Sequence, residues 1–323
     1  MSIKRFKLKE TKNDPQTCIE CGLCTKHCDF LTKYDIHLKD FSHKPEIANE
    51  CCLCEQCYNV CPKNISGMEI ALAHRQDANF KNPFVKTHKS PYLFRNNSDK
   101  TCDDLIFFGC NFVGVYPKTT KHIVENLCGK NGDEITDFSI DCCGKPLLMA
   151  GYTKEQSLKS TKELVKKKKV KRIVTACPNC YHFLKDSLGV EVVSIYTKLK
   201  ELGLMKMVED EAHLFYPCSE RNSRAMFDEF KEFLPNKQDS FLDINCCGAG
   251  GGDKEIAKNY PEKLKAKNKP NLYVYCATCA LVYTKAGVSD VKHLTTLFLG
   301  VDEKPNLSFS KNVLKMKWYK KNR

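Results

Sequence analysis

Two groups of four cysteines have the spacing with which proteins hold iron–sulfur cubanes. The first group is Cys18, Cys21, Cys24 and Cys28, and the second is Cys51, Cys54, Cys57 and Cys61, which Pro62 follows. In such C-x2-C-x2-C-x3-C runs, the first three thiolates ligate one [4Fe–4S] cluster and the fourth ligates the neighbouring cluster. The predicted ligands are therefore Cys18, Cys21, Cys24 and Cys61 for cluster 1, and Cys51, Cys54, Cys57 and Cys28 for cluster 2.

Zinc knuckles are the structural alternative, but zinc sites use two separated pairs of ligands rather than compact quartets. Asp29 stands where a proline usually follows the fourth cysteine, which removes a rigid turn but no ligand. Cys52, beside Cys51, is interpreted as a packed thiol. Two neighbouring cubanes would carry single electrons, and their irons would all be ligated by protein. Bond chemistry is therefore expected further along the chain.

A second cysteine pattern occurs twice after the quartets: a single cysteine, then Cys-Cys-Gly, then Cys-x-x-Cys. The first copy comprises Cys110, Cys142, Cys143, Cys177 and Cys180, and the second comprises Cys218, Cys246, Cys247, Cys276 and Cys279. Five thiols exceed the four that a cubane or a tetrahedral zinc ion needs. The excess predicts an unusual cluster with a bridging thiolate. Gly144, Gly248 and the glycines at 250–252 are expected to let the backbone approach that cluster.

Strands and helices must bring these cysteines together. The predicted strands are 104–110, 171–177, 213–218 and 271–276, and the predicted helices are 117–127, 153–168, 221–234 and 253–267, with another opening at Pro178. Alternating strands and helices favour parallel sheets, with ligands at the carboxyl ends of the strands. Cys110, Cys177, Cys218 and Cys276 are expected at those ends.

The predicted fold class is α+β and α/β: a mainly helical N-terminal two-[4Fe–4S] ferredoxin domain followed by two duplicated α/β cysteine-rich modules. The predicted boundaries are 1–95 for the ferredoxin-type domain, 100–205 for the first module, 206–305 for the second, and 306–323 for a basic tail. Residues 89–91 and 95–99 are interpreted as a polar linker. Self-similarity of the cysteine pattern indicates the duplication.

The duplicated pattern resembles the cysteine-rich domain of heterodisulfide reductases. The stretches 246–252 and 176–181 match that domain closely, and with the N-terminal quartets the resemblance spans about residues 15–300. The architecture resembles the catalytic D-type subunit, equivalent to fused C and B subunits. In that family the duplicated module holds two noncubane [4Fe–4S] clusters, which reduce a disulfide of coenzyme M and coenzyme B. The resemblance implies that the two five-cysteine sets ligate such clusters, numbered 3 and 4, and form the catalytic site.

The implied reaction fits the electron count. Disulfide reduction needs two electrons, whereas ferredoxin clusters supply them singly. A disulfide held between two clusters would receive one electron from each side. The chain has no G-x-G-x-x-G or Walker A motif, so no flavin or nucleotide of its own is predicted. An electron-donating flavoprotein or membrane cytochrome b subunit is the expected partner, with a small thiol or disulfide as substrate and an anaerobic setting.

Composition agrees with metal ligation. The 323 residues include 21 cysteines, and neither a secretory signal nor an apolar run long enough to span a bilayer is present. We therefore expect a cytoplasmic protein, attached peripherally to the membrane only through a partner. The net charge of +13 omits cluster thiolates. The run Lys166–Lys169 and the basic tail around Trp318 are interpreted as a solvated helix end and a frayed terminus. Docking on an acidic partner or a membrane stays open, and nucleic-acid binding is not expected.

Several alternatives remain at this stage. Related modules serve as electron-relay subunits of flavin-dependent lactate, glycolate or glycerol-3-phosphate dehydrogenases, although such subunits often lack part of a five-cysteine set. If one module binds zinc instead of an iron–sulfur cluster, that module would act as an assembly scaffold. Cys177-Pro178-Asn179-Cys180 has thioredoxin spacing, but other cysteines surround it. His182 and His293 are the histidines to test as proton donors. Cys102 and Cys128 are interpreted as ordinary thiols.

Overall fold

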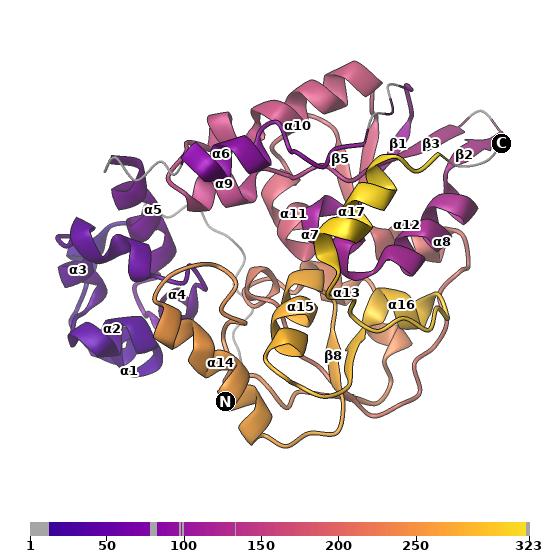
Figure 1. Cartoon of the computed structure of the whole chain (residues 1–323). Coiled ribbons are helices and arrows are strands. Elements are labelled where there is room, and N and C mark those ends of the chain that lie inside the picture. Colours follow the sequence, from indigo (N-terminus) through magenta and orange to yellow (C-terminus); the bar gives the residue numbers. More distant parts are fainter. Residues whose placement is uncertain (1–12, 78–82, 97, 99, 133, 321–323) are drawn as a thin grey trace.

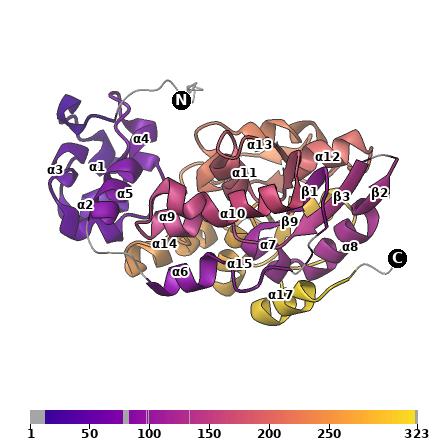
Figure 2. The same ribbon diagram turned by 90° about the horizontal axis from the view of Figure 1, so that it is seen from above.

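The fold has one helical end and two groups of parallel strands covered by helices (Figures 1 and 2). The computed structural model describes residues 13–77, 83–96, 98, 100–132 and 134–320. The start of the chain (1–12), Asn97 and Asp99 of the predicted linker, and the last three residues of the predicted tail (321–323) lie outside the described residues.

Short helices form the N-terminal region, at the left of Figure 1. They are η1 (Pro15–Thr17), α1 (Leu23–His27), α2 (Asp29–Tyr34), α3 (Leu38–Phe41), η2 (Pro45–Glu50), α4 (Gln56–Val60), α5 (Gly67–Asp77) and α6 (Pro83–Lys89), where η denotes a 3-10 helix. The helices are short because the cysteine loops interrupt them. The buried rings of Phe30 and Phe41 pack edge to face, with centroids 5.0 Å apart, and centre a small core.

A five-stranded sheet follows, in the order β2-β3-β1-β4-β5. Its strands are β1 (Asp104–Phe107), β2 (Gly129–Asn131), β3 (Glu134–Ser139), β4 (Arg172–Thr175) and β5 (Glu191–Ser194). Its helices are α7 (Gly109–Val115), α8 (Pro117–Leu127), α9 (Lys145–Met149), α10 (Lys154–Lys168), α11 (Pro178–Leu184) and α12 (Ile195–Glu201). Neighbouring strands are parallel except β2 and β3. The central strand β1 is buried along its whole length, as expected for a parallel strand covered on both faces.

The same strand order recurs in the second half of the chain. The elements are β6 (Ala212–His213), η3 (Cys218–Glu220), α13 (Ala225–Asp228), η4 (Lys231–Phe233), β7 (Lys237–Gln238), α14 (Lys254–Ala266), β8 (Leu272–Val274), α15 (Ala277–Lys285), β9 (Val291–His293) and α16 (Leu294–Phe298). Strand β6 pairs with β7 and β8 pairs with β9, both in parallel, and a parallel bridge joins Leu214 to Tyr273. The order β7-β6-β8-β9 thus repeats β3-β1-β4-β5 of the first sheet.

The glycine of each Cys-Cys-Gly lies where the chain crosses the following helix. Gly144 and Gly248 have φ of +92° and +86°, which side chains rarely adopt. A Cβ at Gly144 would lie 1.8 Å from the Ser157 carbonyl oxygen in α10, and one at Gly248 would lie 2.5 Å from that of Ala257 in α14. They allow close packing of the loop on a helix. That these two glycines also give the backbone access to a cluster stays a prediction.

Four elements differ from expectation. Strand β6 ends at His213, so Cys218 lies in η3 rather than at a strand end. The helix predicted over 221–234 is broken into short turns because Arg224 adopts a left-handed conformation with φ of 52°. Strand β1 ends at Phe107, so Cys110 lies in the first turn of α7 rather than at the strand end. The predicted tail contains the helix α17 (Phe309–Lys317), which packs on α7 through an Asn312 side-chain bond to the Gly114 carbonyl. Helices α8, α10 and α14 lie where helices are predicted.

The segment predicted as a linker is bound to the first sheet. The Asn96 side chain donates to the Phe138 carbonyl at 3.0 Å, and the Ser98 hydroxyl donates to the Asp137 carboxylate at 2.7 Å. Lys168, predicted to be solvated, is buried and pairs with the same Asp137 carboxylate at 2.8 Å. Segments before and after residue 95 therefore pack as one body with the first module.

The N-terminal helices contact both modules through corresponding segments. Arg75 in α5 donates to the Met149 carbonyl at 2.7 Å, at the end of α9, which follows the first Cys-Cys-Gly. Lys33 in α2 pairs with Asp253 at 2.7 Å, in the loop after the second. The buried Cys52 is packed against that second loop, since a Cβ at Gly252 would lie 2.9 Å from its sulfur. Within the described ranges, no helix has both the length and the apolar character that crossing a bilayer requires.

The close approach at Gly144 yields a stability prediction. Gly144→Ala is expected to lower the free energy of unfolding by about 2–4 kcal/mol, from the left-handed backbone and the overlap with Ser157 together. The control is Gly189→Ala, whose φ is +71° but whose added Cβ meets nothing within 4 Å. That variant should lose only about 1 kcal/mol. Chemical denaturation under anaerobic conditions measures both, and equal losses would show that the helix contact contributes nothing.

Candidate iron–sulfur centres

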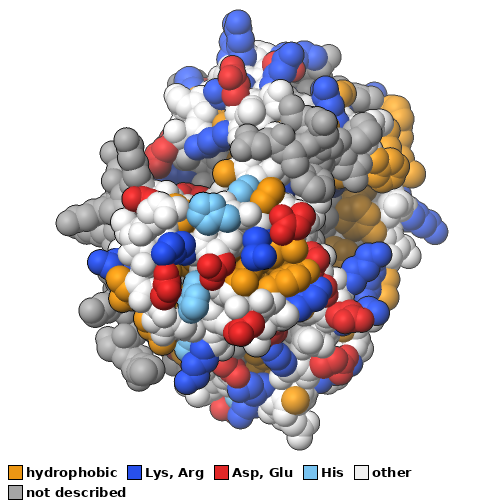
Figure 3. Space-filling view, turned by 90° about the vertical axis from the view of Figure 1, so that its left-hand side faces the viewer, with side chains coloured by type: hydrophobic (Ala, Val, Ile, Leu, Met, Phe, Trp, Pro, Cys, Tyr) orange, Lys and Arg blue, Asp and Glu red, His pale blue; other side chains and the backbone are white. Residues whose placement is uncertain are grey.

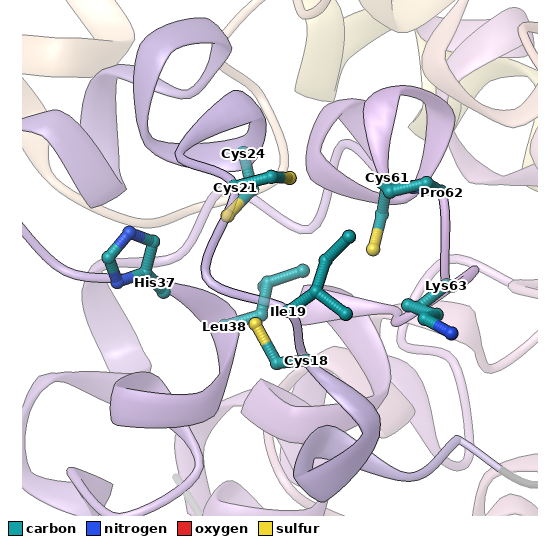
Figure 4. A pocket seen from close by; sticks show the side chains of 9 residues that line it. All are labelled: Cys18, Ile19, Cys21, Cys24, His37, Leu38, Cys61, Pro62 and Lys63. Atoms are coloured by element: carbon teal, nitrogen blue, oxygen red, sulfur yellow. The ribbon is translucent and has the colours of Figure 1, made fainter.

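One pocket gathers the four cysteines predicted for cluster 1. Cys18, Cys21, Cys24 and Cys61 line a space of about 290 Å³ together with Ile19, His37, Leu38, Pro62 and Lys63 (Figure 4). Cys18 follows η1, Cys24 lies in α1, and Cys61 ends α4, so the fourth thiol comes from the other quartet. Cys28 does not line this pocket. The geometry is that of the exchanged fourth ligand.

Both quartets use the same backbone device. Glu20 and Leu53, each two residues after the first cysteine of its quartet, have φ of 54°. Their amide groups donate to the sulfurs of Cys18 and Cys51 at 3.4 and 3.5 Å. Amide donors aimed at cysteine sulfurs stabilise thiolate charge and tune the potential of a bound cluster.

The cysteines predicted for cluster 2 lie deeper, against the second module. Cys28 and Cys54 line a pocket of about 690 Å³ that Tyr260 and Lys263 of α14 also line. Burial raises the pKa of the Cys51 thiol to about 12. A Cβ at Gly67 would lie 2.6 Å from the Cys57 sulfur, so this position requires glycine. The thiols predicted for cluster 2 thus lie together near the start of α5.

The first five-cysteine set is a continuous run of thiols. Cys110 is within hydrogen-bonding range of Cys142, Cys142 of Cys143, Cys143 of Cys180, and Cys180 of Cys177. Helix α7, the Cys-Cys-Gly loop and the start of α11 supply these side chains. A Cβ at Gly109 would lie 2.9 Å from the Cys180 sulfur, which leaves this small space to the thiols.

The second set repeats this arrangement. Cys246 is within hydrogen-bonding range of Cys247, Cys247 of Cys279, and Cys279 of Cys276. The Cys218 thiol is near enough for the charges of Cys247 and Cys276 to act on it, and burial raises its pKa. The Gly248 amide donates to the Cys246 sulfur at 3.2 Å, as the amides of the quartets do for theirs.

The two sets meet. The thiols of Cys177 and Cys276 are within hydrogen-bonding range of each other, so the cysteines of both modules form one array, in which Cys110, Cys177 and Cys218 are partly exposed. Asn179 lies at the junction: its amide nitrogen is 3.8 Å from the Cys276 sulfur, and its oxygen accepts from Lys145 at 2.7 Å. Because Cys177 contacts Cys276 as well as Cys180, the Cys-x-x-Cys pair is not isolated as in thioredoxin-type sites.

Three cations that the sequence analysis did not single out surround the array. Burial opposes the charge of Lys89, yet the thiolates of Cys110 and Cys142 raise its pKa. Lys145 acts on the Cys218 thiolate from the opposite module. The sequence could have indicated Lys145 as a cation near the thiols, because it directly follows Cys-Cys-Gly. It gave no such indication for Lys89, which lies in the segment predicted as a linker.

Arg221 is the third cation, and it lies near both the cysteines predicted for cluster 2 and the second set. The thiolate charges of Cys218, Cys54 and Cys246 act on its guanidinium group. The group is held by the carbonyl oxygens of residues 241, 242 and 244, and it lies over the Phe215 ring at 5.4 Å. Arginine stays charged at physiological pH, so this site carries a fixed positive charge.

The two candidate histidines are both engaged. His182 contacts the carboxylate of Glu220, which is fully buried. His293 is fully buried, and burial lowers its pKa to about 3. Its Nδ1 accepts from the Thr295 amide at 3.2 Å and caps α16. Burial thus favours the neutral form of His293, and its Nε2 atom has no hydrogen-bond partner within the described part of the chain.

Orphaned polar atoms test whether the second set fits a bound group. Ser219 Oγ, Arg221 Nε and Asn222 Oδ1 are buried without hydrogen-bond partners within the described part of the chain. All three follow Cys218 directly, and buried polar atoms normally have partners. They fit a polar or charged group held at this cysteine. No three His, Cys, Asp or Glu side chains of the described ranges are arranged to hold a single metal ion.

Comparison with known proteins supports the cysteine assignment at a coarse level. The model of the CCG family, described as a cysteine-rich domain, matches residues 105–185, which contain the first five-cysteine set. An uncharacterized iron–sulfur protein of Methanococcus maripaludis is 25% identical over 318 residues, covering 81% of this chain and 64% of the relative. An uncharacterized iron–sulfur protein of Methanocaldococcus jannaschii is 25% identical over 298 residues, covering 76% of this chain and 61% of the relative.

The chain thus spans less than two thirds of the length of these relatives. Two solved structures also align: a glutamate racemase of Francisella tularensis, with 15% identity over 70% of this chain and 96% of its own, and an aspartate racemase of Picrophilus torridus, with 12% identity over 66% and 99%. Their TM-scores of 0.31 and 0.32 support no conclusion on fold or activity. The cysteine-rich domain, the relatives' names and the 21 cysteines together support iron–sulfur cluster binding and redox activity.

The fixed charge of Arg221 yields an electrochemical prediction. Arg221→Gln is expected to make the potential of an adjacent cluster more negative by about 60 mV, a tenfold change in a one-electron equilibrium constant, because reduction adds negative charge. Arg221→Lys keeps the charge but loses the carbonyl contacts. An unchanged potential in this variant would show that the charge, and not the hydrogen bonds, sets the potential. Arg224→Gln is the matched control, because Arg224 lies over the Tyr216 ring instead. Redox titration followed by electron paramagnetic resonance measures the shift, and equal potentials in all variants would contradict it.

Proposed function

We propose that the chain is an iron–sulfur oxidoreductase that reduces a small disulfide, as the catalytic part of a heterodisulfide-reductase-like complex. In this proposal the N-terminal helices are a two-cluster ferredoxin domain, and the cysteine quartets hold two cubane [4Fe–4S] clusters. The two α/β modules hold noncubane clusters on the five-cysteine sets. The observation that carries the proposal is the junction at Cys177 and Cys276, where the two sets meet. Zinc in one module stays a prediction that metal analysis tests.

An electron route into the array is supported by the packing of the second module. Thiolate charges of Cys54 and Cys246 interact, and Tyr260 of α14 lies near Cys54, Cys52 and Cys246. Arg221 lies beside the same thiols. The quartet buried against α14 is therefore the closer donor for the second set, which in turn meets the first set at Cys276. Electrons would enter through the second module.

The proposed reaction balances with two electrons and two protons: the S–S bond of the substrate breaks, and two S–H bonds form. The bound clusters would supply electrons singly and an iron site for each sulfur. The chain's own contribution is charge and position. Lys89 and Lys145 place a cation on each side of the array, where they oppose the negative charge that reduction builds up. Asn179 holds Lys145 against the junction.

The electrons come from outside the chain in this proposal. A flavoprotein or a membrane cytochrome b subunit would donate them, and the protein would act in the cytoplasm of an anaerobic cell. The oxidised substrate would be a small disulfide such as that of coenzyme M and coenzyme B. The competing proposal, an electron-relay subunit of a flavin-dependent dehydrogenase, needs no substrate at the junction.

Two single cysteine variants, compared in an activity assay, test the proposal. Anaerobically purified protein with reduced viologen as donor should convert coenzyme M–coenzyme B disulfide, or another disulfide of a small panel, to thiols. Cys177→Ser should lower that rate by more than roughly 100-fold, because the two sets lose their junction. Cys102→Ser is the matched control, since Cys102 is buried but belongs to no set.

The readouts separate the two proposals. The rate of thiol release reports disulfide reduction, and bleaching of the cluster absorbance by reduced viologen without any disulfide reports electron transfer alone. A chain that relays electrons but neither reduces a disulfide of the panel nor changes its paramagnetic spectrum with added thiols would contradict the disulfide-reductase proposal. The relay function would then take its place.

A further inference from the structure

The outer face of α17 and the segment after α6 form an apolar–basic patch. We define the patch by six exposed residues: Leu93, Lys311, Leu314, Lys315, Trp318 and Lys320. Within α17 the inner residues Val313 and Met316 are buried. Residues 311, 314, 315 and 318 follow helical spacing on the opposite side. The helix is therefore packed on one face and has Leu, Trp and two lysines on the other.

A direct contact joins the two parts of the patch. Lys317 Nζ donates to the Leu93 carbonyl at 3.1 Å, which links α17 to the segment that follows α6. Figure 2 shows α6 and α17 along the same edge of the molecule. Leu93 and Trp318 are 51% and 65% exposed, so large apolar side chains flank this contact in solvent. Exposed apolar groups of this size call for an occupant.

The charge of the patch is of one sign. Neither residues 83–96 nor residues 304–320 contain an aspartate or a glutamate, and the second range contains five lysines. The face of the N-terminal helices differs, since acidic and basic side chains are interspersed there (Figure 3). A partner for the patch must therefore be negative and must accept apolar side chains between the charges.

We propose that the patch binds the surface of an anionic phospholipid bilayer. Tryptophan favours the membrane interface, where its ring is apolar and its N–H is hydrated. Lysines on the same helical face attract anionic headgroups, and an amphipathic helix of this kind lies in the interface plane. The single apolar residues alternate with lysines instead of lining a groove, which suits a fluid surface. The inference is independent of the proposed function, because it involves none of the cysteines.

The single tryptophan of the chain provides a specific test. Full-length protein, purified without oxygen, is mixed with vesicles of phosphatidylcholine containing about 30% phosphatidylglycerol, and with vesicles of phosphatidylcholine alone. Trp318 emission should shift to shorter wavelength with the anionic vesicles only, and brominated lipids should quench it. Co-sedimentation gives the partition coefficient. Lys311→Ser with Lys315→Ser should lower that coefficient by roughly 25-fold at low salt, about five-fold per lysine.

Matched variants keep the outcome interpretable. Lys159→Ser with Lys162→Ser makes the same charge change at exposed positions of α10 and should leave vesicle binding unchanged. Equal losses in both double variants would mean binding by net charge and would overturn the assignment. No binding by the unaltered protein at low salt would overturn it too. A concentration-dependent dimer that the α17 variant abolishes, without vesicle binding, would show that a second copy covers the patch instead.

Discussion

Burial of cysteine thiols where two α/β modules meet is the constraint on which the rest of the structure depends. A thiolate inside a protein is costly without a cation, and burial accordingly raises the pKa of Cys51 and Cys218. Metal binding removes the proton and adds its own free energy to folding, so these sites and the core are stabilised together. The helices that follow these thiols also contribute to the core: α11 and α15 begin directly after Cys177 and Cys276, and each has several buried side chains.

The duplicated modules are not equivalent, although their strand orders match. Both contact the N-terminal helices through the segment that follows Cys-Cys-Gly. Only the second module brings its thiols close to the deeper quartet, with Arg221 near both. The first module instead has Lys89 over its thiols. In the proposed function, this asymmetry gives electron transfer a direction, from the quartets through the second set to the first.

Much of this arrangement could be predicted from sequence because cysteine spacing reports local geometry. The quartet rule anticipates that Cys61 joins Cys18, Cys21 and Cys24, and the pocket gathers those four. Helices α8, α10 and α14 follow from their periodicity and caps. The junction of Cys177 with Cys276 was beyond such reasoning, because contacts between distant modules depend on tertiary packing. The left-handed Arg224 that breaks the predicted 221–234 helix has no signal in residue type.

Two errors had the same physical origin. The predicted linker and tail are polar and basic, and this polarity alone led to the prediction that both segments are exposed to solvent. Asn96 and Asn312 instead use their amides to bind backbone carbonyls of the first module, and Val313 and Met316 provide a buried stripe. The Cys-Cys-Gly glycines also pack closely on the following helix, a contact that only the position of that helix could reveal.

The central claim is that four clusters occupy the four cysteine sets. Quantification of iron, acid-labile sulfide and zinc per chain, after strictly anaerobic purification, tests it most directly. The account predicts about 16 iron atoms, four for each cluster, with a matching amount of sulfide and little zinc. About eight iron atoms with one or two zinc ions would contradict it, because the quartets alone would then hold clusters and the five-cysteine array would be a zinc scaffold.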